Sequence, residues 1–110
     1  MSTPAFPYRG PPESLPAIDA ALRRVVDPEV AMNIVDVGLV VDVCLHEGAL
    51  HVQVTMTSAA CPVADVVVAD VRHELEHALP DGPRVQVELV WHPEWTPERM
   101  SASARRFMGW

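Results

Sequence analysis

The pattern of apolar and polar residues along this chain changes its period several times, and each change marks an expected element boundary. Between Leu15 and Val25, apolar residues recur at helical spacing, which is typical of an amphipathic helix. Ser14 is a suitable N-cap, and Pro28 cannot continue a helix. We therefore expect a first helix over residues 15–26.

Two runs of alternating apolar and polar residues follow, and they predict a β-hairpin. Glu47-Gly48 separates the runs and is a turn signal. In the first run, the residues expected to face the core are Leu39, Val41, Val43 and Leu45, with Val40, Asp42, Cys44 and His46 opposite. In the second run they are Leu50, Val52, Val54 and Met56, with His51, Gln53, Thr55 and Thr57 outward.

From Pro62 the pattern becomes helical again, and Pro62 itself suits a first helical turn. The apolar stripe consists of Ala64, Val67, Val68, Val71, Leu75, Ala78 and Leu79. The Pro-rich segment 80–83 ends this helix, and alternation over residues 85–91 predicts a third strand whose inner face includes Trp91. Thr96 is the expected cap of a last helix that stops at Gly109.

The element order helix, strand, strand, helix, strand, helix predicts an α+β fold. We expect a compact two-layer sandwich, with helices on one face of a three-stranded sheet that is either antiparallel or mixed. Five of the eleven prolines precede residue 17, so residues 1–13 are expected to form a disordered Pro-rich tail. Residues 14–95 are then the folded domain, and residues 96–110 a helical C-terminal extension.

The composition narrows the classes of partner. Apolar residues make up 49% of the chain and charged residues 21%, as in ordinary globular domains. The formal net charge is -7, which disfavours binding to a nucleic acid or an anionic membrane. We recognise neither an apolar run of bilayer-spanning length nor a secretion signal. We therefore expect a cytoplasmic protein with reduced cysteines.

Residues 73–77 read His-Glu-Leu-Glu-His, which matches the H-E-x-x-H pattern of zinc metalloproteases. Both histidines fall opposite the apolar stripe of the predicted helix, so we expect them to face solvent. A catalytic zinc also requires a third protein ligand and a dry cleft. The metalloprotease is therefore a remote alternative, and a solvated helix face is the favoured interpretation.

Cys61 lies where the second alternating run gives way to the second helix. A helix N-terminus favours the thiolate form of a cysteine, which is both a nucleophile and a metal ligand. Thr55 and Thr57 lead toward this position, and a small domain can bring Asp27 and Glu29 close to it. Cys61 is thus a candidate reactive or metal-binding residue, with an inert buried thiol as the alternative. The other cysteine, on the outward face of the first strand, is interpreted as structural.

Three segments carry a joint motif at specific spacing. They are Asp27-Pro28-Glu29, Asn33-Ile34-Val35-Asp36-Val37-Gly38-Leu39-Val40 and Thr55-Met56-Thr57-Ser58-Ala59-Ala60-Cys61-Pro62. The chain resembles the MIP18 family, also called the DUF59 domain, from about Leu15 to Trp91. Within that family it is similar to the bacterial SUF-associated branch.

The resemblance implies a compact α/β sandwich that acts in iron–sulfur cluster assembly and in the maturation of client proteins. It also implies a functional set, in which Cys61 binds metal or cluster and Asp27, Glu29, Thr55 and Thr57 support it. An iron–sulfur cluster typically takes four thiolate ligands, and this chain offers one good candidate. We therefore expect Cys61 to hold iron or a nascent cluster transiently, together with a second subunit or a partner protein.

Two other classes of function stay open at this point. The first is a non-catalytic adaptor, in which Trp91 and Trp95 help to dock assembly proteins onto apo clients. The second, a thiol-dependent enzyme, lacks an identifiable base, since His51 is a weak candidate. We expect a protein that is not an enzyme, and the sequence leaves open whether it forms a homodimer.

Overall fold

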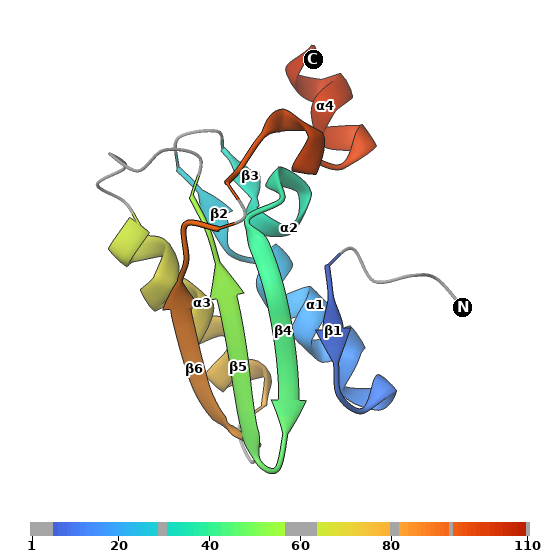
Figure 1. Ribbon diagram of the computed structural model, residues 1–110. Helices are drawn as coiled ribbons and strands as arrows, with labels where there is room; N and C mark the ends of the chain where they lie inside the picture. The colour runs from blue at the N-terminus through green and yellow to red at the C-terminus, as the bar shows by residue number, and fades with distance from the viewer. Residues whose placement is uncertain (1–5, 29–30, 57–63, 80–81, 93, 110) are drawn as a thin grey trace.

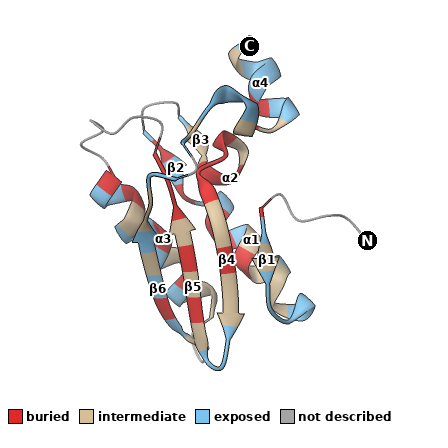
Figure 2. Cartoon of the chain, in the orientation of Figure 1, coloured by how far each residue is buried: buried red, intermediate tan, exposed pale blue. Residues whose placement is uncertain are grey.

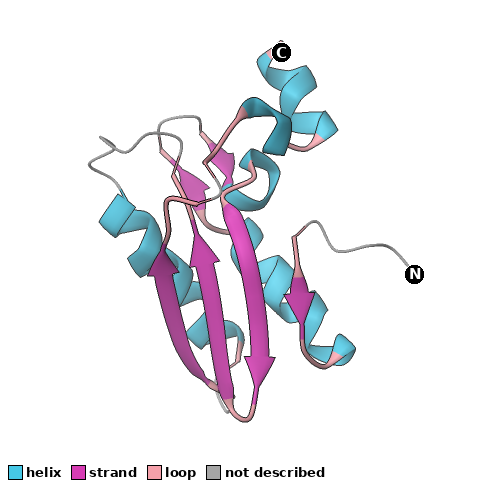
Figure 3. Cartoon of the chain, viewed as in Figure 1, coloured by secondary structure: helices cyan, strands magenta, loops and turns pink. Residues whose placement is uncertain are grey.

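The computed structural model describes residues 6–28, 31–56, 64–79, 82–92 and 94–109. Within these residues, a mixed sheet is covered on one face by two helices, and smaller elements gather at one end of the sheet (Figure 1). The predicted α+β class and two-layer arrangement are therefore confirmed. Figure 3 shows the division into helices, strands and loops.

The main sheet has the strand order β1-β4-β5-β6. Its strands are β1 (Tyr8–Arg9), β4 (Val40–His46), β5 (Ala49–Val54) and β6 (Arg84–Leu89). Strands β4 and β5 are antiparallel, whereas β1 runs parallel to β4 and β6 runs parallel to β5. The sheet is thus mixed, and in the described residues it contains one strand more than the sequence pattern predicted.

The core lies between this sheet and two helices, α1 (Leu15–Arg23) and α3 (Ala64–Ala78). On α1, Ile18 and Leu22 are fully buried, and on α3 Val67, Val71 and Leu75 are fully buried. These positions follow the helical spacing of apolar residues in each segment. Figure 2 shows how the buried residues concentrate between the two layers.

The β4–β5 hairpin forms as predicted, but β4 contains an irregularity. The inward residues expected for the second strand are all buried: Leu50, Val52, Val54 and Met56. The pairing register shifts between Val40 and Asp42, so that Val40 pairs with Val54 and is itself buried. A bulge adds a residue to one strand and changes which side chains face the core. The expected inward position of Val41 and outward position of Val40 are therefore wrong.

The Pro-rich N-terminal segment contributes to the fold from Phe6 onward. Phe6 is buried, and β1 pairs in parallel with β4 through residues that include Val43, whose N–H donates to Pro7. Arg9 forms an ion pair with Asp42 on the neighbouring strand. The expectation of an irregular tail over residues 1–13 is wrong for this part, because a proline at a sheet edge still offers its carbonyl as an acceptor.

Helix α1 starts and ends differently from the prediction. A short 3-10 turn (Pro12–Ser14) precedes it, and the Ser14 side chain makes no capping hydrogen bond. The helix stops at Arg23 rather than near residue 26, because Val26–Asp27 forms strand β2, which pairs with β3 (Met32–Asn33). Strand pairing thus ends the helix before Pro28 can do so.

Helix α3 carries the two histidines of the H-E-x-x-H segment on its exposed face, as predicted. The His73 and His77 ring centroids lie 4.1 Å apart with the ring planes tilted by 47°, and His77 Nδ1 lies 3.0 Å from the His73 carbonyl oxygen. In the described ranges, no group of three or more His, Cys, Asp and Glu residues is arranged to hold a metal ion. This geometry gives the metalloprotease alternative no support.

The C-terminal part of the chain also departs from the prediction. Strand β6 ends at Leu89, and Trp91 is 42% exposed rather than part of the inner face. Thr96 leads into a 3-10 turn (Pro97–Arg99), whereas helix α4 (Ala102–Met108) is capped by Ser101, whose Oγ accepts from the Ala104 N–H. Gly109 ends α4 in a left-handed conformation, as predicted. No helix in the described part of the chain is long and apolar enough to span a membrane.

Candidate functional site

Two buried polar side chains mark the candidate site. Among the described residues, Asp27 and Thr55 are the only polar or charged residues in the buried class, with exposed fractions of 0% and 1%. A carboxylate or a hydroxyl loses its hydration when it is buried, which is unfavourable unless a partner compensates for the loss. Both residues belong to the set that the family resemblance implies. Such buried polar groups are candidates for a functional role.

Asp27 is held in a small hairpin. Strands β2 and β3 pair so that Asp27 lies opposite Met32. The Ala31 N–H donates to the Asp27 carbonyl at 2.8 Å, and Ala31 adopts a left-handed conformation with φ of 56°. The Asp27 backbone is thus part of the paired hairpin.

Thr55 lies just beyond the end of β5. Its N–H donates to the Leu39 carbonyl at 2.8 Å, which extends the hairpin by one bond beyond Val54. Its Oγ1 is buried and has no hydrogen-bond partner within the described segments. A buried polar group without a partner costs about 1–3 kcal/mol. A hydroxyl buried at such a cost is well suited to form a hydrogen bond with a bound ligand.

Backbone hydrogen bonds connect the two residues to the same end of the sheet. The Ile34 N–H donates to the backbone carbonyl of Val25 at 3.0 Å, and Val25 lies two residues before Asp27. The Leu39 N–H donates to Ile34 at 2.9 Å, and Leu39 in turn accepts the bond from Thr55. Figure 1 shows β2, β3 and the end of β5 together at this end of the molecule. The fold therefore gathers Asp27 and Thr55 there, although they are far apart in sequence.

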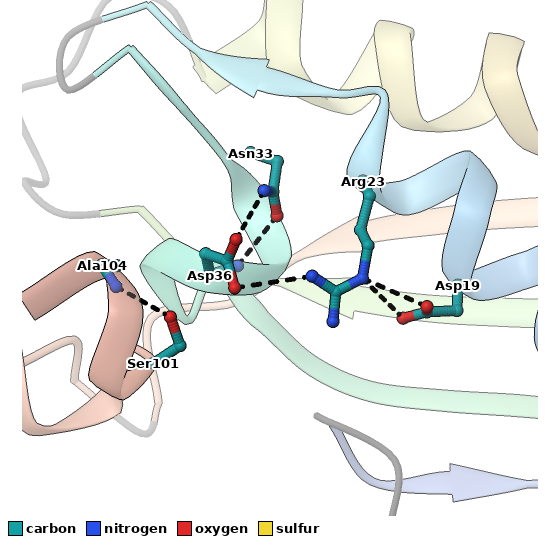
Figure 4. Close-up of polar contacts among 6 residues, drawn as sticks. All are labelled: Asp19, Arg23, Asn33, Asp36, Ser101 and Ala104. Carbon is teal, nitrogen blue, oxygen red and sulfur yellow. Dashed lines mark hydrogen bonds and ion pairs between the residues drawn. The ribbon is translucent and has the colours of Figure 1, made fainter. Parts of the chain in front are cut away.

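The segment between these two residues has a structural role. Helix α2 (Ile34–Val37) begins after Asn33, whose Oδ1 accepts from the Asp36 N–H at 2.9 Å while its Nδ2 donates to Asp36 at 2.7 Å. This reciprocal pair resembles a capping box. Asp36 also lies 3.5 Å from Arg23 of α1, as Figure 4 shows. The motif therefore fixes the short helix that supports the hairpin.

The C-terminal segment covers the carboxyl end of α2. Trp95 Nε1 donates to the Val37 carbonyl at 2.8 Å, and Arg99 Nε donates to the Gly38 carbonyl at 2.9 Å. The Ser101 N–H donates to the backbone carbonyl of Asp36 at 2.8 Å. Carbonyls at a helix end have no partner within the helix, so these donors satisfy groups that are otherwise orphaned. Sequence reasoning missed Arg99, because no local pattern indicates a contact with residues some sixty positions away.

Gly38 is essential to this contact. It has a φ of 87°, and a Cβ placed there would overlap the backbone carbonyl of Arg99. Glycine is thus required both by the left-handed conformation and by the close approach of the C-terminal segment. Glycine at position 38, within the motif of residues 33–40, is therefore required by a contact between distant parts of the chain.

The structure places the remaining predicted residues as follows. Glu29, Thr57 and Cys61 lie outside the described residues. Thr55 was expected on the outward face of the sheet and is instead buried, because it stands past the end of β5. His51 lies in mid-strand on the open face, 3.4 Å from Glu88, so it does not join the candidate site.

Comparison with known proteins identifies the family. Residues 16–89 match the sequence pattern of the family described as "Iron-sulfur cluster assembly protein". The chain belongs to this family. The matched region includes both buried polar residues and the whole supporting segment between them. The family identified by resemblance is therefore confirmed.

Relatives in this iron–sulfur cluster assembly family cover most of the chain. The chain is 42% identical over 93 residues to the Fe-S protein maturation auxiliary factor YitW of Bacillus subtilis, spanning 84% of this chain and 90% of the relative. It is 36% identical over 86 residues to the Fe-S protein maturation auxiliary factor SufT of Staphylococcus aureus, spanning 77% and 97%. A DUF59 domain crystal structure from Bacillus anthracis has a TM-score of 0.81 and 38% identity, covering 87% of this chain and 91% of that one.

Proposed function

We propose that this protein is an iron–sulfur cluster maturation factor that holds iron or a nascent cluster transiently as cargo. Cys61 supplies the thiolate, while Asp27, Glu29, Thr55 and Thr57 complete or tune the site. The observation that carries the proposal is the selective burial of Asp27 and Thr55, two members of this set, at one end of the sheet. The names of the relatives support the same process.

The chemistry of these donors suits such a cargo. A carboxyl group is an oxygen donor that suits a metal cation, and a hydroxyl without a partner among the described residues can donate to a sulfide or thiolate. Thiolate is the usual ligand of cluster iron, but one thiolate cannot complete the coordination of a cluster. The remaining ligands therefore come from a second subunit, an assembly protein or the client. This incomplete ligand set favours transfer over permanent storage and suits a protein that is not an enzyme.

The first test is anaerobic reconstitution with iron and sulfide, followed by transfer to apo-ferredoxin. We expect the wild-type protein to develop visible absorption and to load apo-ferredoxin. Cys61→Ser should abolish both, because a serine hydroxyl is a poor substitute for a thiolate. Cys44→Ser is the matched control, since Cys44 is a free, half-buried cysteine in mid-strand of β4. If Cys61→Ser retained full loading and transfer, the carrier function would be refuted.

An adaptor without cargo is the second candidate, and one observation favours it. Trp91 is 42% exposed beyond the end of β6, where it can anchor a partner. Trp95 is less suited to this role, because its indole N–H is engaged by Val37. Trp91→Ala should abolish client maturation while Cys61→Ser retains it if the adaptor explanation is correct. Loss with Cys61→Ser alone would favour the carrier.

A further inference from the structure

Strand β6 forms one edge of the main sheet, and its outer backbone groups have no partner strand in the described part of the chain (Figure 1). The Arg84 N–H donates to the Gly48 carbonyl at 2.9 Å, and the Val90 N–H donates to the Val54 carbonyl at 2.8 Å. Since alternate residues of a strand bond to opposite sides, the residues between them direct their N–H and C=O groups away from β5. These outward residues are Val85, Val87 and Leu89. The edge is therefore open to a further strand.

This edge lacks the features that usually protect a sheet from further pairing. Natural edge strands are short, bulged, or interrupted by proline or lysine. The opposite edge follows this rule, because β1 has only 2 residues and lies between Pro7 and Pro11. Strand β6 has 6 residues, contains neither proline nor lysine, and pairs with β5 along its whole length without a register shift. Of the two edges, β6 is thus the one at which a further strand can pair.

The side chains of β6 divide between the two faces of the sheet. Val85 is buried on the helix-covered face, whereas Val87 and Leu89 on the same face are only half-buried, although they pack against the core. The residues of the open face are all exposed: Arg84, Gln86 and Glu88. A further strand covers the half-buried side chains only if its own apolar residues lie on the helix-covered face. This condition restricts the register in which a partner strand can pair.

The two charged residues of β6 make the edge complementary to itself. Arg84 forms no ion pair in the described part of the chain. Glu88 is contacted by Gln53 at 3.1 Å and by His51 at 3.4 Å, both through Oε1, which leaves Oε2 available. If a second β6 runs antiparallel with Gln86 opposite Gln86, each Arg84 lies opposite Glu88 of the other copy. Such directly opposed charges, about 4.5 Å apart between Cα atoms, stabilise strand pairing.

We propose that two copies of this chain form a homodimer in which their β6 strands pair antiparallel about Gln86. In this register Val85 of each copy lies opposite Val87 of the other, and these residues can exchange both of their outward backbone hydrogen bonds. Polar residues then meet on the open face and apolar residues on the helix-covered face. A second copy is favoured over an unrelated strand because it satisfies both charges and covers both half-buried side chains at once. The edge is also locally neutral, although the chain carries a net charge of -7.

The dimer holds its two candidate sites apart. Leu89 pairs with Val54, the residue before Thr55, so the candidate site lies at the Leu89 end of β6. Antiparallel pairing places the corresponding site of the other copy at the opposite end of the joined sheet. The ligands that complete each cargo site therefore come from an assembly protein or a client and not from the dimer partner. This consequence rests on the proposed function, whereas the dimer itself does not.

Charge reversal with rescue provides the direct test, with sedimentation velocity of the full chain under reducing conditions as the readout. We expect the wild type to be a dimer. Arg84→Glu and Glu88→Arg should each weaken dimerisation about tenfold or more, because like charges then face each other across the pair. The double variant Arg84→Glu/Glu88→Arg should restore the dimer, since the exchanged charges again attract. A loss caused by misfolding would not be restored in this way.

Arg106→Glu is the matched control, because Arg106 is exposed on α4 and forms no ion pair within the described residues. It should dimerise as the wild type does. A wild type that stays monomeric over the whole concentration series would overturn the proposal. So would a dimer that Arg84→Glu leaves intact, or a double variant that does not recover.

Disulfide trapping tests the register. The proposed pairing brings the two Gln86 positions face to face, within the Cα separation that a disulfide spans. In a chain whose native cysteines are replaced by serine, Gln86→Cys should give a covalent dimer on mild oxidation. Gln53→Cys is the control, because Gln53 lies on the same face of the interior strand β5, and it should remain unlinked. Cross-linking through Val87→Cys in place of Gln86→Cys would overturn the proposed register.

Cluster loading separates this proposal from the proposed function. Cys61→Ser should abolish loading and leave the dimer unchanged, whereas monomeric Arg84→Glu should load as much iron per chain as the wild type. If the wild type is monomeric and loads through Cys61, the dimer fails and the carrier function stands. If Cys61→Ser loads normally as a dimer, the carrier function fails and the dimer stands. A loss of loading in Arg84→Glu that the double variant restores would overturn the separation of the two sites.

Discussion

The molecule contains two β-hairpins in which the reversal of chain direction is stabilised in different ways. The β4–β5 hairpin turns at Glu47 and Gly48, which have positive φ values of 50° and 77° and are exposed. In the β2–β3 hairpin, by contrast, Asp27 is buried. This hairpin packs against α2, which the C-terminal segment covers. The first is a local turn whose residues suit it. The second is maintained by distant parts of the chain.

This difference separates a hairpin that is fixed by its own turn from one that carries a candidate site residue. Nothing lies within 4 Å of a Cβ placed at Gly48, whereas at Gly38 the space is filled by Arg99. A buried hydroxyl that has no partner among the described residues is unfavourable for stability. The contacts between the C-terminal segment and α2 compensate for this loss of stability.

The largest effect should come from glycine substitution at the supported end. Gly38→Ala should lower the free energy of unfolding by about 3 kcal/mol, because it combines left-handed strain with a clash against Arg99. Gly48→Ala should cost about 1 kcal/mol, since only the strain applies. Urea denaturation measures both. Equal costs at the two positions would show that the C-terminal segment does not support α2.

The buried hydroxyl gives the next largest effect. Thr55→Val should leave the free energy of unfolding unchanged or raise it by up to about 1 kcal/mol, because it removes a polar group that has no partner in the described residues. Cluster transfer should nevertheless fall about tenfold, which corresponds to about 1.4 kcal/mol. The exposed Thr96 provides a control for transfer, and Thr96→Val should leave cluster transfer unchanged. A large loss of stability with normal transfer would make Thr55 a purely structural residue.

The capping residues should give smaller effects that differ between the two sites. Asn33→Ala removes the cap of α2 and should cost about 1 kcal/mol of global stability. Ser101→Ala removes the cap of α4, which is near the chain terminus, so it should speed local amide exchange of α4 without a change in the denaturation midpoint. Hydrogen exchange combined with urea denaturation distinguishes the two. An equal global loss would mean that α4 unfolds together with the core.

The smallest effect concerns Tyr8 at the sheet edge. Burial raises the pKa of Tyr8 above its ordinary value, and the charges of Glu13 and Cys44 raise it further. A raised pKa in the folded state stabilises the protein below the unfolded value of about 10, and this contribution is lost as the pH rises through the folded value. Tyr8 is the only tyrosine in the chain, so phenolate absorbance reports its titration directly.

Two variants test this assignment. Cys44→Ser should bring the Tyr8 titration closer to its ordinary value, because it removes a neighbouring negative charge. Tyr8→Phe should remove this contribution to the alkaline loss of stability. An ordinary tyrosine titration in the wild-type protein would contradict the assignment.

Much of the architecture was predictable from local pattern. The apolar stripe of α3, the inward face of β5 and the exposure of His73 and His77 follow directly from helix and strand periodicity. Periodicity failed at Val40, where a bulge changes the parity of the strand. It also failed for the N-terminal segment, because the parallel pairing of β1 with β4 leaves no local signal. Local pattern therefore predicts elements well and their long-range partners poorly.

The candidate site likewise combines features that the sequence indicates with features that depend on long-range packing. The resemblance selected Asp27 and Thr55, but their burial could not be read from the sequence. Strand alternation placed Thr55 on the solvent side, since alternation assumes that a strand continues. The importance of Gly38 was visible only as part of a motif, and its reason lies in Arg99. Side chains distant in sequence come together through packing, and no period in the sequence encodes that contact.

Local periodicity and motif spacing are sufficient to predict the α+β class, the main hairpin, the two core helices and the family. The burial of Asp27 and Thr55 at one end of the sheet, and the position of Arg99 beside Gly38, are visible only in the folded chain. A groove between α4 and the β3–α2 corner is likewise visible only there. The physical reason is that burial and close approach depend on long-range packing, which forms only when the whole chain has folded.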